Sequence, residues 1–138
     1  MLNHITLRVS DFEKSQDFFS KALEPLGYKI LKKDKDENID YTSVGYAVID
    51  KEGHRDFWVK KVKDYKVTTP SFSCLAFTAT SKEMVNEFHK AAIEAGGKDN
   101  GKPGYRVKYH PGYYAAYVLD PDGYNIEAVF DDMSMLDK

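Results

Sequence analysis

The sequence predicts an α+β domain built from two copies of one βαβββ module, and three observations carry this prediction. Residues 4–10 align with residues 74–80 at an offset of 70, and the same offset brings Gly27 onto Gly97. Each copy begins with alternating apolar and polar residues, as in a strand with one buried face. Apolar residues at helical spacing follow in both copies, which predicts two amphipathic helices.

Both helices are predicted to begin at a capping box. Ser10-x-x-Glu13 and Thr80-x-x-Glu83 have the spacing at which a hydroxyl and a carboxylate satisfy the free amide groups of a first turn. Glycines follow each apolar stretch and predict where each helix ends.

Three further strands are predicted after each helix. They span about 28–33, 41–50 and 55–60 in the first copy, and lie near Lys98, at 113–120 and at 124–130 in the second. The turn 120–123, Asp-Pro-Asp-Gly, separates the last two strands. The single domain, 1–138, therefore comprises module one (about 1–60), a linker (about 61–70), module two (about 71–130) and a tail (131–138). With the helices outside, the polar faces of the mixed sheet are expected to line a shared cup.

Composition narrows the classes of protein that fit. Of 138 residues, 42% are apolar and 30% charged, and the net charge is -2, which predicts a globular protein without a nucleic-acid partner. We expect no membrane span, because no apolar run is long enough, and a cytoplasmic location. The single cysteine, Cys74, excludes an internal disulfide. The chain has no glycine-rich phosphate loop, so no nucleotide cofactor is expected.

Two sequence motifs connect this predicted fold with a known family. His4 lies in the predicted first strand, and the turn 120–123 is followed by x-x-Ile126-Glu127. Together with the duplicated module, they resemble the glyoxalase/bleomycin-resistance/extradiol-dioxygenase (vicinal oxygen chelate) superfamily over essentially the whole chain. The run 104–116 resembles a glyoxalase-like branch of it. The resemblance implies a homodimer that takes a small-molecule ligand in the cup.

The resemblance also implies a metal site with two ligands from each module. Carried over residue by residue, His4 and Glu127 are intact ligands, and Cys74 takes the place of a third. The fourth position falls on Phe57 at the strict offset, or on Trp58 with a shift of one residue, and neither aromatic side chain can bind a metal.

Several readings of this incomplete ligand set stay open. A thiolate, an imidazole and a carboxylate with one open position suit zinc, and the divalent metal implied by the resemblance is zinc, nickel, manganese or iron. Asp56 or His54 could supply the missing ligand if the strand register slips. Alternatively, His4 and Glu127 hydrogen-bond each other without a metal, and Cys74 is a small core residue.

The segment 106–117 is the most distinctive part of the chain. Arg106, Tyr109 and His110 precede a predicted strand that begins at Tyr113, and we expect them to contact an anionic ligand at the mouth of the cup. Tyr113 is a further candidate for ligand contact. Trp58 is expected to form an apolar wall.

Two functions follow from these expectations. The first is an enzyme of the lyase, isomerase or dioxygenase type, acting on a small oxygen-bearing or anionic molecule, with Glu127 as metal ligand and catalytic base. The second is a metal-free protein that binds a small molecule, as in bleomycin-resistance sequestration. The retained His4 and Glu127 favour the enzyme, whereas the incomplete ligand set favours the binding protein.

Overall fold

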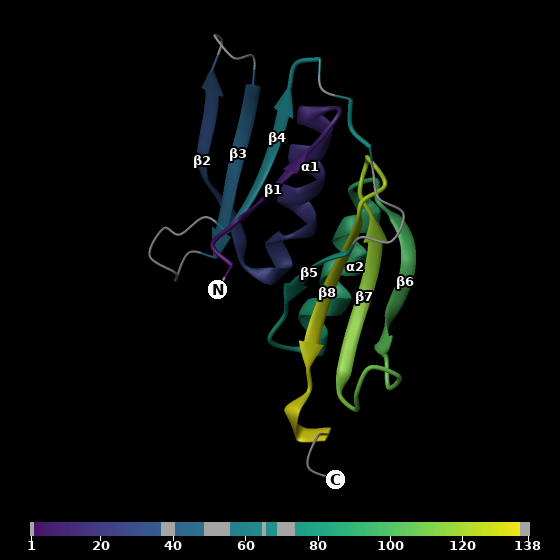
Figure 1. The fold of residues 1–138 in the computed structure, drawn as a ribbon. Coiled ribbons are helices and arrows are strands. Elements are labelled where there is room, and N and C mark those ends of the chain that lie inside the picture. Colours follow the sequence, from purple (N-terminus) through teal and green to yellow (C-terminus); the bar gives the residue numbers. More distant parts are fainter. Residues whose placement is uncertain (1, 37–40, 49–55, 65, 69–73, 136–138) are drawn as a thin grey trace.

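The computed structural model describes residues 2–36, 41–48, 56–64, 66–68 and 74–135, and it has the predicted tandem βαβββ architecture (Figure 1). The elements of the first module are β1 (Ile5–Arg8), α1 (Phe12–Ala22), the short 3-10 helix η1 (Glu24–Leu26), β2 (Tyr28–Asp36), β3 (Tyr41–Val48) and β4 (Phe57–Val62). Those of the second are β5 (Cys74–Thr78), α2 (Lys82–Glu94), β6 (Lys98–Tyr105), β7 (Tyr113–Leu119), β8 (Asn125–Asp131) and η2 (Met133–Met135).

Each module forms its own mixed four-stranded sheet, in the order β1-β4-β3-β2 for the first and β5-β8-β7-β6 for the second. The first strand of each module pairs in parallel with the last, while the other pairs are antiparallel. The two sheets therefore repeat one topology, which confirms the predicted fold class.

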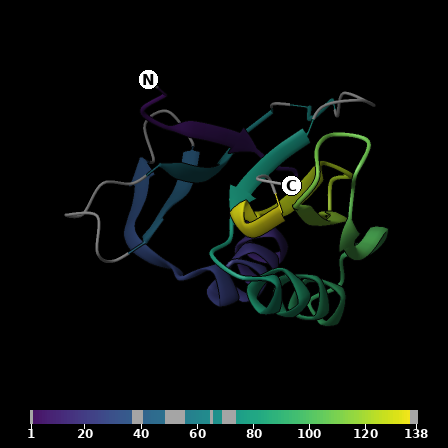
Figure 2. The same ribbon diagram turned by 90° about the horizontal axis from the view of Figure 1, so that it is seen from below.

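One apolar core joins the two modules. The helices α1 and α2 lie together on one side of the sheets (Figure 2). Phe19 of α1 packs on Phe57 of β4, with 5.0 Å between ring centroids, and Phe57 packs in turn on Phe77 of β5 at 5.2 Å. Because alternate residues of a strand point to opposite faces, the neighbours of these core residues point away from the helices. We call that side of each sheet its outer face.

The helix starts differ from the prediction by one residue. The N-caps are Asp11 and Ser81, whose side chains accept hydrogen bonds from backbone N–H groups three residues later. Ser10 instead donates its hydroxyl to Asp122 in the other module, and the Thr80 hydroxyl contacts the sulfur of Met84 at 2.9 Å. The capping-box prediction was therefore wrong, because Ser10 makes a tertiary contact instead and Thr80 contacts a side chain of the first helical turn.

No helix in the described part of the chain is long and apolar enough to cross a membrane.

Candidate functional site

The register of the two sheets settles which residue of the first module corresponds to Glu127. In the parallel pairs, Thr6 lies beside Trp58 and Ala76 lies beside Glu127, and 76 − 6 gives the offset of 70 that relates β1 to β5. Trp58 is therefore the counterpart of Glu127. Phe57, the alternative at the strict offset, is 1% exposed and belongs to the core.

Glu127 lies on the outer face of the second sheet and is nevertheless 4% exposed. The Tyr113 hydroxyl donates to its Oε1, and the Cys74 thiol donates to its Oε2 with a distance of 3.3 Å. A buried carboxylate requires donors of this kind, because removal from water is costly when no partner replaces it. Both carboxylate oxygens are thus satisfied by uncharged groups of the same chain.

These donors stay protonated. Burial, followed by the contact with Glu127, raises the pKa of the Cys74 thiol to about 12. The same two causes raise the pKa of the Tyr113 and Tyr117 hydroxyls above the ordinary value of a tyrosine. At neutral pH the carboxylate is therefore surrounded by neutral O–H and S–H groups, not by a thiolate.

Tyr117 extends this cluster along β7, where it lies directly opposite Glu127. Its ring occupies the space above Gly101, since a Cβ on that glycine would lie 2.8 Å from the ring. The Arg106 guanidinium also lies over this ring, with its carbon 5.5 Å from the ring centroid. Arg106 also donates to the carbonyl oxygens of Lys102 at 2.6 Å and Gly104 at 2.9 Å. Two of its five N–H groups therefore bind the strand that precedes it, β6.

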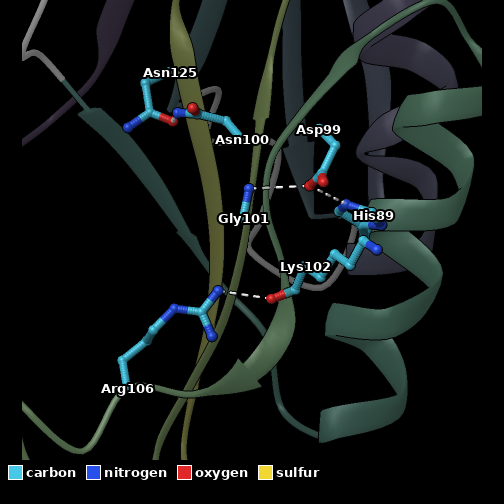
Figure 3. Close-up of polar contacts among 7 residues, drawn as sticks. All are labelled: His89, Asp99, Asn100, Gly101, Lys102, Arg106 and Asn125. Atoms are coloured by element: carbon cyan, nitrogen blue, oxygen red, sulfur yellow. Dashed lines mark hydrogen bonds and ion pairs between the residues drawn. The ribbon is translucent and has the colours of Figure 1, made fainter.

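Strand β6, against which Arg106 packs, is longer than the short strand predicted near Lys98 and is interrupted by two register shifts. Side chains hold the irregular stretch in place (Figure 3). Asp99 accepts from the backbone N–H of Gly101 at 3.0 Å and lies 3.0 Å from the imidazole of His89 on α2. Side-chain contacts of Asp99 and Arg106 thus stand in for the ladder hydrogen bonds that the shifts remove.

The remaining residues of the segment 106–113 form an aromatic rim beside Glu127. The Tyr109 ring lies 5.0 Å from that of Tyr113 and is 56% exposed. His110 lies against the edge of Tyr113, and its Nε2 is 3.0 Å from the Asp131 carboxylate. Tyr109 and Tyr113 therefore present ring surface at the site, whereas His110 already has an acidic partner.

The outer face of the first sheet carries a second group, centred on Trp58. The indole lies over Gly45, where an added Cβ would come within 2.9 Å of the ring. Lys60 shares this face as the next outward residue of β4, and Arg8 lies beside Lys60 in the sheet. Lys32 pairs with Gly45 on the other side. The sequence analysis missed these cations. The spacing of two residues from Trp58 to Lys60, and from Thr6 to Arg8, is the signal that places Lys60 and Arg8 on the same face.

The two outer faces therefore carry different groups. The first sheet presents an indole among basic side chains, and the second presents a buried carboxylate among phenols and a thiol. The first face can hold a flat acidic molecule, and the second can accept a hydrogen bond from a hydroxyl group.

His4 is not part of the Glu127 cluster. It precedes β1, its Nδ1 lies 2.8 Å from the Asn3 side-chain oxygen, and its ring lines a pocket between the two modules. Within the described residues, His4 and Glu127 share no hydrogen bond or ion pair. Asp56 also lines that pocket and accepts a hydrogen bond from the Tyr28 hydroxyl at 3.1 Å. His54 lies outside the described residues.

The donor set does not fit the metal that the resemblance implies. No group of three or more His, Cys, Asp or Glu side chains that could hold a metal ion occurs among the described residues. Trp58 takes the place of a ligand, the Cys74 thiol stays protonated, and both oxygens of Glu127 already accept hydrogen bonds.

Duplicated βαβββ modules, with a glutamate on the last strand after an Asp-Pro-Asp-Gly turn, define the class of this protein. The chain belongs to the glyoxalase/bleomycin resistance protein/dioxygenase superfamily, whose family model matches residues 1–128. It is 29% identical over 136 residues to the uncharacterized protein YqjT of Bacillus subtilis (strain 168), an alignment that covers 93% of this chain and 97% of YqjT.

Solved structures resemble the chain in the same way. A glyoxalase/bleomycin resistance protein from Albidiferax ferrireducens T118 matches with a TM-score of 0.69 and 27% identity, over 93% of this chain and 96% of that one. Glyoxalase I from Zea mays matches with a TM-score of 0.70 and 26% identity, over 94% of this chain and 45% of the maize chain. This chain thus spans less than half of the maize enzyme.

Proposed function

We propose that the protein binds a small aromatic acid bearing a hydroxyl group, and that it does so on the outer faces of its sheets without a metal ion. The observation that carries this proposal is that Trp58 and Glu127 occupy equivalent positions of the two modules. One position offers a flat apolar plate and the other a hydrogen-bond acceptor. Neither arrangement depends on a bound cation.

The chemistry of each group suggests how such a ligand would be held. The thiol of Cys74 is a weak donor, so a ligand hydroxyl can replace it at Oε2 of Glu127 with a gain in hydrogen-bond strength. Tyr109 and Tyr113 offer ring surface for stacking beside that point. A carboxylate on the ligand would find Lys60 and Arg8 beside Trp58.

The competing function is that of a metal-dependent lyase or isomerase, and the presence of His4 and Glu127 favours it. For that reaction both residues would have to leave their present hydrogen bonds and meet around one ion, together with a deprotonated Cys74. The metal-free protein requires no such rearrangement, which is why we favour it.

Fluorescence titration can test the proposal, because Trp58 is the only tryptophan of the chain. We expect 4-hydroxybenzoate to quench the emission of Trp58, equally in EDTA and in added Zn²⁺, Ni²⁺, Mn²⁺ or Fe²⁺. Benzoate lacks the hydroxyl and should bind about tenfold more weakly, since a hydrogen bond to a charged group contributes about 1.5–3 kcal/mol.

Two variants make the test specific. Glu127→Gln should remove the preference for the hydroxylated ligand, whereas Glu83→Gln, an exposed carboxyl on α2, should leave it unchanged. Binding or turnover that appears only with a metal ion, and disappears with EDTA, would establish the enzyme instead.

A homodimer is part of the proposal, and an exposed apolar patch supports it. Val107 and Tyr109 are 69% and 56% exposed, and Met133 of η2 is 65% exposed. The two segments are adjacent, because the N–H of Asp132 donates to the carbonyl of Gly112. Light scattering at micromolar concentration should give twice the mass of the chain, and Val107→Lys should lower that mass to a monomer's.

A further inference from the structure

A pocket lies between the two modules, and neither Trp58 nor Glu127 lines it. Its volume is about 440 Å³, within the range of small-molecule sites. Phe57 and Leu26 line it from the first module, and Leu75 and Phe77 line it from the second. The apolar part of the wall therefore comes from both copies of the repeat, and polar side chains complete the lining.

One acidic side chain lines this pocket. Asp56 lines the pocket, and its Oδ2 accepts a hydrogen bond from the Tyr28 hydroxyl at 3.1 Å. Its Oδ1 is buried and has no hydrogen-bond partner. Burial and the nearby Asp56 carboxylate raise the pKa of Tyr28, so the hydroxyl remains a neutral donor. A buried carboxylate oxygen without a donor is costly, and a bound molecule that supplied one would remove this cost.

No lysine or arginine among the described lining residues balances the charge of Asp56. Among the described residues, those that line the pocket include no lysine and no arginine, and His4 is the one side chain there that can carry a positive charge. The hydroxyls of Thr78 and Thr80 are neutral. A cation is therefore a better partner for Oδ1 than another neutral donor.

We infer that the pocket between the modules binds a small organic amine, with its ammonium group on Asp56 and its apolar body against Leu75 and the packed rings of Phe57 and Phe77. This site goes beyond the proposed function. It uses neither Trp58 nor Glu127, so one site can fail while the other holds.

Calorimetric titration with benzylamine tests the inference, with benzyl alcohol as the neutral probe and benzoate as the anionic one. We expect benzylamine to bind, and both other probes to bind at least about tenfold more weakly. Asp56→Asn keeps an acceptor for Tyr28 but removes the charge, and it should weaken benzylamine binding by a similar factor. Glu127→Gln should leave the affinity unchanged, and Tyr28→Phe should retain binding.

A measurement on the unaltered protein keeps the test decisive if Asp56→Asn does not fold. With ¹³C-methyl methionine, benzylamine should shift the signal of Met84, which lines the pocket, and leave those of Met133 and Met135 in place. The inference is overturned if benzylamine does not bind, if benzoate binds equally well, if Asp56→Asn binds as tightly as the wild type, or if the Met84 signal does not move.

Discussion

Asp120, in the turn that leads into β8, gives the sharpest prediction about stability. Its side chain is 5% exposed. Oδ1 accepts from the backbone N–H of Asp122 at 3.0 Å and of Tyr124 at 2.8 Å, while Oδ2 is buried without a partner. Burial is the largest cause that raises its pKa, from 3.8 to about 7, and the backbone donors oppose this shift only in part.

The direction of the effect follows from proton linkage. Because the pKa of Asp120 is higher in the folded chain, the folded state binds the proton more tightly between about pH 4 and pH 7. Asp120 therefore lowers the free energy of unfolding as pH rises through this window, and its effect is constant above pH 7. A shift of about 3 pKa units corresponds to about 4 kcal/mol.

Asp120→Asn isolates this contribution. The amide oxygen can still accept from the two backbone donors, but the NH₂ group replaces an oxygen that has no partner, at a cost of about 1–3 kcal/mol. We therefore expect the variant to be about 1–3 kcal/mol more stable than the wild type at pH 8, and equally or less stable at pH 4.5. Urea denaturation at a series of pH values measures both quantities.

Asp17→Asn is the matched control, since Asp17 is an exposed aspartate in an i,i+4 pair on α1. It should change the free energy of unfolding by less than about 1 kcal/mol over the neutral range. The reasoning about Asp120 is refuted if the difference in stability between wild type and Asp120→Asn is the same at pH 4.5 and pH 8.

Three further predictions concern the outer faces and the contact between the modules. Gly45→Ala should displace the Trp58 ring, shift its emission and cost about 1–3 kcal/mol, because the new Cβ would lie 2.9 Å from the indole; unchanged emission would contradict this placement. With its pKa near 12, the Cys74 thiol should react slowly with a disulfide reagent at pH 8, and faster in Glu127→Gln; rapid labelling of folded wild type would count against the cluster. Asp122→Ala should lower the free energy of unfolding by about 1–2 kcal/mol in urea denaturation, because it removes hydrogen bonds to the loop before α1; equal stability would show that this contact contributes nothing.

The architecture could be predicted from the sequence because the same pattern of strand alternation followed by helical spacing occurs in both copies. Alternation in residues 4–10 and 74–80, and helical spacing after each, depend on local burial that tertiary contacts do not reverse. Strand β6 was mostly missed, because Gly101, Pro103 and Gly104 are residues that weaken a strand pattern. Its pairing depends on contacts from α2 and from Arg106, which no local pattern records.

Single residues of the candidate site could be predicted from the sequence, but the contacts between them could not. The motif indicated Glu127, but its partners Tyr113 and Cys74 are 14 and 53 residues away in the sequence. Only the register of the strands distinguishes Trp58 from Phe57 as the counterpart of Glu127. A one-residue shift moves a side chain to the opposite face, so the offset alone could not decide between them.

The contact between Phe57 and Phe77 has a consequence for how the chain can be divided. Each ring comes from a different copy of the repeat, and each covers apolar surface that the other copy would leave in water. A chain cut between Val62 and Cys74 would give two halves with unfinished interiors. Such halves should be poorly folded apart and should recover native structure when mixed, which makes the protein a natural candidate for a split reporter whose halves reassemble.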